Sequence, residues 1–134
     1  MLRRISLIAA STAMLALSAL PASASAMPSS THKLSFPGLH GVKAWGTYVK
    51  TSRGVRVAVC AEDTSRSVFA AGAVVVASNA SKKFHANVGA VAFGYHQEIC
   101  RSMTLRYTAH LNVYTFTGTK KGTIGSRSKT KTIY

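Results

Sequence analysis

Residues 103–116 read Met103-Thr104-Leu105-Arg106-Tyr107-Thr108-Ala109-His110-Leu111-Asn112-Val113-Tyr114-Thr115-Phe116 and contain the clearest structural pattern in this chain. From Met103 to Val113 every second residue is apolar, and the residues between them are polar. This period of two is typical of a strand that lays one face on a core and turns the other to water. We therefore expect one continuous strand from Met103 to Phe116 in an antiparallel sheet.

Other segments have the same character. Apolar and β-branched runs predict strands over Val42–Lys50, Val55–Cys60, Val68–Ala77, Phe84–His96 and Thr123–Tyr134. The first two form a hairpin, and the last pairs back on the strand that ends at Phe116. Six strands joined by short turns predict an all-β domain, a small antiparallel meander arranged as a sandwich or barrel.

The N-terminal residues have the pattern of a secretory signal peptide. Two arginines precede an apolar run and small residues, and cleavage is expected after Ala26 or Ala24. The apolar run contains Ser and Thr and is short for a membrane span. We expect a general secretory signal over residues 1–26, a flexible leader over 27–41 and a single domain over 42–134. The sequence thus predicts a secreted, extracellular protein, and the style of the signal is bacterial.

Two cysteines, Cys60 and Cys100, remain after removal of the signal. In an exported chain an isolated pair predicts a disulfide, which would stabilise the fold by about 4 kcal/mol. The alternative is two free thiols, one of them catalytic, but neither cysteine has an acidic or histidine neighbour in the sequence. If Val55, Val57 and Val59 face the core, Cys60 faces outward unless a bulge redirects it.

Two cysteines and one tryptophan raise an immunoglobulin-like interpretation, which fails because Trp45 precedes both cysteines instead of lying between them. The stretches Ala44–Tyr48 (Ala-Trp-Gly-Thr-Tyr) and Cys100–His110, with the alanine-rich signal, resemble small, basic, one-disulfide secreted proteins of actinobacteria that have no assigned activity. That resemblance implies a shared fold and a secreted location, and no mechanism.

The charge balance is strongly basic. Signal removal lowers the formal charge from +14 to +12 and leaves only Glu62, Asp63 and Glu98 as acids against fifteen Lys and Arg. We expect a monomeric, non-enzymatic binding or surface protein for anionic partners: a cell-wall polyanion, an acidic protein, or nucleic acid bound non-specifically. The candidate anion-binding residues concentrate near the end of the chain: Lys120, Lys121, Arg127, Lys129 and Lys131. The alternative is charge that serves solubility or protects an edge strand.

The sequence contains no clear catalytic or cofactor-binding motif. No Cys and His spacing suits zinc, no glycine-rich phosphate loop is present, and we expect neither cofactor nor metal. An alternative function is a small basic secreted ribonuclease with Glu98, Arg106 and His110 as catalytic groups, although these polar residues are also what the solvated side of a sheet presents. A further alternative is a protease inhibitor or antimicrobial factor that uses loop 62–67 or 78–83.

Overall fold

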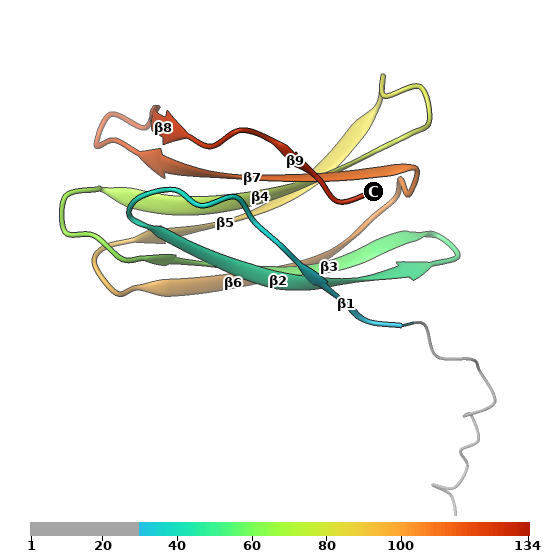
Figure 1. Cartoon of the computed structure of the whole chain (residues 1–134), viewed down its shortest axis with the longest axis horizontal. Coiled ribbons are helices and arrows are strands. Elements are labelled where there is room, and N and C mark those ends of the chain that lie inside the picture. The colour runs from blue at the N-terminus through green and yellow to red at the C-terminus, as the bar shows by residue number, and fades with distance from the viewer. Residues whose placement is uncertain (1–29) are drawn as a thin grey trace, which may run out of the picture.

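The computed structural model of the chain describes residues 30–134 (Figure 1), so the signal expected over residues 1–26 lies outside the described part. The described residues form nine strands and no helix. Their bounds are β1 (His32–Leu34), β2 (Val42–Thr51), β3 (Gly54–Asp63), β4 (Ala70–Ser78), β5 (His85–Phe93), β6 (Glu98–Leu105), β7 (His110–Gly118), β8 (Ile124–Arg127) and β9 (Lys131–Thr132).

The strands form two antiparallel sheets that lie face to face as two layers (Figure 1). We call the sheet with strand order β1-β2-β3-β6 sheet A, and the sheet with order β5-β4-β7-β8 sheet B; β9 also pairs with β7 in sheet B. The all-β class, the antiparallel pairing and the sandwich arrangement expected from the sequence are confirmed. The strands do not pair in simple sequence order, because β3 pairs with β6 and β4 pairs with β7.

The prediction of a single strand from Met103 to Phe116 is wrong. The segment divides into β6, which pairs with β3 in sheet A, and β7, which pairs with β4 in sheet B. Leu105 ends β6 and Leu111 lies near the start of β7, and both are buried in the core. The apolar alternation is the same in the two halves because each sheet turns one face to the same core. Residues 106–109 connect the sheets across the end of the sandwich, which the alternation alone does not reveal.

The hairpin expected from the sequence is confirmed in β2 and β3. Val55, Val57 and Val59 are fully buried between the sheets, and residues of the opposite parity face outward. β3 runs further than expected and includes Glu62 and Asp63, so the connection to β4 begins only at residue 64.

Sheet B is built largely from small residues. Ala71, Ala73 and Ala77 in β4 and Ala90 and Ala92 in β5 are buried. The strand expected over 68–77 is confirmed but begins at Ala70 and ends at Ser78, and the strand expected over 84–96 is confirmed with the shorter range of β5. Small inward side chains let the two sheets approach closely, whereas larger side chains lie on the outer face of sheet B.

The two ends of the described chain both join the sandwich. Structure was expected to begin near Val42, but β1 pairs with β2 within the proposed leader, and Leu34 is buried in the core with Phe36 packed against it. At the other end, β8 and β9 pair with β7, which confirms that the C-terminal segment returns to that strand.

The strand order has a known architectural counterpart. The strand order matches the Greek-key arrangement of immunoglobulin-type sandwiches. In sheet A, β2, β3 and β6 correspond to strands A, B and E of that arrangement. In sheet B, β5, β4, β7 and β8 correspond to strands C′, C, F and G. The exclusion of an immunoglobulin-like interpretation from the order of Trp45 and the cysteines is therefore wrong for the strand order, although the disulfide between sheets and the tryptophan between the cysteines are absent. The likeness is one of architecture, and architecture does not define a function.

Candidate functional site

The disulfide between Cys60 and Cys100 is confirmed. It joins directly opposite residues of β3 and β6, whose Cα atoms are 4.1 Å apart, on the outer face of sheet A. The β3 register is continuous here, so no bulge redirects Cys60, and Trp45 of β2 is its partner on the other side. The bond therefore links neighbouring strands within one sheet and leaves the core between the sheets untouched.

The five basic residues near the end of the chain do not converge. Lys120 and Lys121 lie in the exposed turn between β7 and β8. The Arg127 guanidinium lies over the Tyr114 ring, with 3.7 Å between its carbon and the ring centre, on the outer face of sheet B. Lys131 Nζ instead donates a 2.7 Å hydrogen bond to Ser35 Oγ beside β1. The sequence placed these cations close together along the chain, but the strand pairing turns them to different sides.

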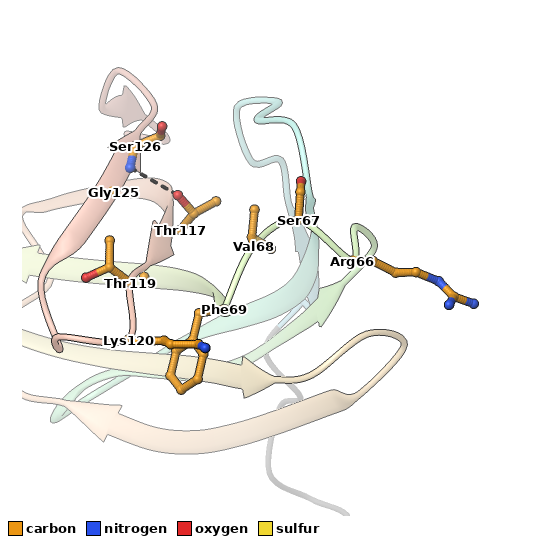
Figure 2. A pocket seen from close by; sticks show the side chains of 10 residues that line it. Arg66, Ser67, Val68, Phe69, Thr117, Thr119, Lys120, Gly125 and Ser126 are labelled. Atoms are coloured by element: carbon orange, nitrogen blue, oxygen red, sulfur yellow. Dashed lines mark hydrogen bonds between the residues drawn. The ribbon is translucent and has the colours of Figure 1, made fainter.

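A hollow of about 530 Å³ lies between the β3–β4 connection and the β7–β8 hairpin (Figure 2). We call it the hairpin hollow, and its lining combines an aromatic ring, small residues, hydroxyls and cations: Arg66, Ser67, Val68, Phe69, Thr117, Gly118, Thr119, Lys120, Gly125 and Ser126. No acidic side chain lines it. Phe69 is 44 % exposed, so its ring is available to a ligand.

Two side chains at the hairpin hollow have defined partners. Thr117 Oγ1 accepts a 3.0 Å hydrogen bond from the Ser126 N–H, which fixes the hairpin wall. The Arg66 side chain extends away from the hollow in Figure 2, and its guanidinium carbon lies 4.6 Å from the centre of the Tyr95 ring. Lys120 is thus the cation of the lining that remains free to meet a ligand, and Arg66 adds positive potential at the rim.

The three acids of the domain gather at one corner, which we call the acidic corner: Glu62 and Asp63 end β3, and Glu98 begins β6 directly opposite Glu62. Asp63 is fully buried, and its Oδ1 accepts a 3.0 Å hydrogen bond from the Ser65 N–H. Glu62 Oε2 lies 3.5 Å from His96 Nδ1. Exposed negative charge is therefore confined to a small area.

At the opposite end of the sandwich the charged side chains of the connections are all basic. The β2–β3, β4–β5 and β6–β7 connections all lie there (Figure 1), and we call this the basic end. It brings together cations far apart in the sequence: Lys50, Arg53, Lys82, Lys83 and Arg106. The sequence does not reveal this group, because it depends on which turns share an end of the sandwich.

The residues considered for a ribonuclease are not brought together. Glu98 begins β6 and Arg106 follows its last residue, Leu105, so the two are separated by the strand, which spans about 23 Å. His110 begins β7 in the other sheet and is half-buried. Concerted acid–base chemistry needs groups within hydrogen-bond reach of one substrate, and this arrangement does not provide it.

Within residues 30–134, no group of three or more His, Cys, Asp or Glu side chains is arranged to hold a metal ion. In the same residues no helix is long and apolar enough to cross a membrane.

Fold and surface together define a class: a small, basic β-sandwich domain with one disulfide bond between adjacent strands. Searches with protein-family models, curated proteins and solved structures find no match. The resemblance to secreted actinobacterial proteins therefore stays a prediction, and function has to be argued from the surface of this chain itself.

Proposed function

We propose that residues 1–26 act as a signal peptide for export, and that the domain binds an anionic glycopolymer outside the cell without catalysing a reaction. The observation that carries the proposal is the charge arrangement. Fifteen Lys and Arg side chains spread over the domain, whereas the three acids share the acidic corner and one of them is buried. A polyanion approaching any other part of the surface meets attraction.

The hairpin hollow supplies the contact site in this proposal. A sugar ring can lie on the exposed face of Phe69, while the Ser67 and Thr119 hydroxyls exchange hydrogen bonds with it and Lys120 pairs with a phosphate, sulfate or carboxylate group. An aromatic surface with a few polar groups fixes orientation, and the surrounding charge raises the rate of encounter. Lys121 adds to this attraction from the same turn.

The test is retention of the purified protein on heparin resin and on wall material that carries or lacks its phosphate polymer. Retention should fall steeply with added salt, because bound polyanions release counterions. Lys120→Gln should weaken binding about tenfold, since it removes a charge-assisted hydrogen bond inside a hollow. Lys129→Gln removes the same charge from an exposed position outside the hollow and should weaken binding about threefold or less.

Equal losses for the two variants would remove the hairpin hollow from the proposal. Retention that does not change with salt would refute electrostatic binding altogether.

Export has its own test. Protein recovered from the culture medium should begin at Met27 or Ser25, according to the cleavage position. Recovery only from cells with residues 1–26 intact would contradict it.

A further inference from the structure

One edge of sheet B lacks the protection that the other has. At the β8–β9 edge the strand is divided into segments of four and two residues and carries Arg127 and Lys131. At the opposite edge β5 is nine residues long and contains no Lys, Arg, Asp, Glu or Pro. Its register with β4 is unbroken from His85 to Phe93, so no bulge bends it. Charges, prolines, bulges and short strands are the usual means of preventing a sheet edge from pairing with another chain.

The backbone of β5 presents free hydrogen-bonding groups at this edge. Within the described residues β5 pairs only with β4. The Asn79 N–H donates to the Phe84 carbonyl, so Phe84 and every second residue after it face β4. The N–H and C=O groups of the alternate residues then point to the open side: His85, Asn87, Gly89, Val91 and Phe93. Phe93 confirms this alternation, because its N–H donates a 2.6 Å hydrogen bond to Gln97 Oε1 and not to β4.

Exposed apolar side chains gather along the same side of the sandwich. In the described part of the chain six large hydrophobic side chains are strongly exposed, and four of them lie on β5, on β6 or in the connections on either side of β5: Phe84, Phe93, Tyr95 and Met103. Phe69 and Phe93 contact each other with ring centres 5.9 Å apart. Between the edges of β5 and β6 runs a groove of about 180 Å³ with a mixed lining: Asn87, Val88, Gly89, Arg101, Ser102 and Met103. Large exposed apolar side chains beside an unpaired strand edge favour an interaction site there.

We propose that the partner at this edge is a second copy of the same chain, with β5 of each copy paired antiparallel over His85–Val91. Such pairing is self-complementary and closes with two-fold symmetry, so it makes a dimer instead of an open fibre. It joins the two copies of sheet B into one continuous sheet and pairs the free backbone groups of both edges.

The charge arrangement selects an antiparallel second copy over an unrelated peptide. Antiparallel pairing of β5 sets the basic end of one copy beside the acidic corner of the other. Lys82 and Lys83 precede β5, and Glu98 follows the short connection after it. A strongly basic chain repels its own copies, and this is the orientation in which its few acids offset that repulsion.

The test is the mass of the purified protein by sedimentation over a range of concentrations. We expect a dimer for the wild type and a monomer for Asn87→Pro. The Asn87 N–H points to the open side, so proline there removes a hydrogen bond between copies and none to β4. Val91→Lys places a charge on the same edge and should also give a monomer, with at least a tenfold rise in the dissociation constant. It serves as the second variant if the proline impairs folding.

Thr132→Lys is the matched control, because it adds the same charge to an exposed residue on the opposite edge of sheet B, and it should remain a dimer. A wild-type monomer up to about 100 µM would overturn the proposal, since a stable interface associates well below that concentration. A dimer that survives both Asn87→Pro and Val91→Lys would place the interface elsewhere and would overturn it equally. Binding to heparin resin by the monomeric variants separates this inference from the proposed function, because the hairpin hollow does not include β5.

Discussion

Removal of the disulfide by the double substitution Cys60→Ser/Cys100→Ser should destabilise the domain without changing its fold. The two cysteines are 40 residues apart in the sequence, and chain-entropy theory gives a loss of about 4 kcal/mol for a loop of that length. The native state itself should change little. Both side chains lie on the outer face of sheet A, and β3 and β6 stay paired over the whole of β6 by their backbone ladder.

The size of this effect is measurable. A loss of about 4 kcal/mol should lower the melting temperature by about 15–25 °C in a domain of this size, and it is a large part of the total stability expected for one. Denaturant titration should show a lower midpoint. Its slope should rise, since the unfolded chain without the bond exposes more surface. Trp45, the cross-strand neighbour of Cys60, should become more fluorescent because the quenching sulfur pair is gone.

A matched control keeps the interpretation clear. Ala58→Ser changes the preceding outward-facing residue of β3 and should leave the midpoint nearly unchanged. A loss below about 1 kcal/mol for the double cysteine variant would contradict the entropic argument, because it would show that the β3–β6 pairing already restricts the unfolded chain. A collapse of all secondary structure would contradict the claim that the core is independent of the bond.

Three further predictions concern a contact on the outer face of sheet B, the burial of β1 and the titration of Tyr134. Gly72→Val should destabilise the domain by about 1–3 kcal/mol, because the new Cβ would overlap the Phe116 ring on the outer face of sheet B. Adding Phe116→Ala should relieve part of this loss. If denaturant titration shows that the losses of the two single variants simply add, the contact is contradicted. Leu34→Ala should cost about 2–3 kcal/mol because β1 belongs to the core, whereas a neutral result would show that β1 is dispensable. Burial, and secondarily the nearby Tyr48, raises the pKa of Tyr134 above its ordinary value of 10.0. The folded state therefore favours the protonated phenol. The free energy of unfolding should fall as the pH rises above 10.0 toward the higher pKa of the folded state. Ultraviolet titration should show one late phenolate that is missing in Tyr134→Phe, and an unchanged titration in that variant would refute the assignment.

Sequence reasoning was most reliable where burial imposes a local period. Apolar and β-branched runs placed β2, β3, β4 and β5 within a few residues, and the alternation in β3 predicted from parity alone that Cys60 faces outward. It failed where the same period continued across a change of sheet. Leu105 and Leu111 both face the core, so nothing in the pattern marks the turn between them. It also missed β1, because a three-residue strand between proline-containing segments shows no period.

The candidate sites were less predictable than the fold. Lys120 and Lys131 are close in the sequence, yet one lines the hairpin hollow and the other reaches Ser35 beside β1. Conversely, Arg53, Lys83 and Arg106 are far apart in the sequence and share the basic end. A surface cluster depends on which connections meet at one end of the sandwich, and local composition carries no information about that.

The sequence by itself determined the class of this protein: an all-β chain with one disulfide, a strong positive charge and the pattern of an export signal. Each of these follows from local period, composition or cysteine count. Only the tertiary structure decided the strand order, the split of residues 103–116 between two sheets, the confinement of the acids to one corner and the unprotected edge at β5. The physical reason is that pairing between distant strands is chosen by the packing of the whole core, which local patterns permit but do not specify.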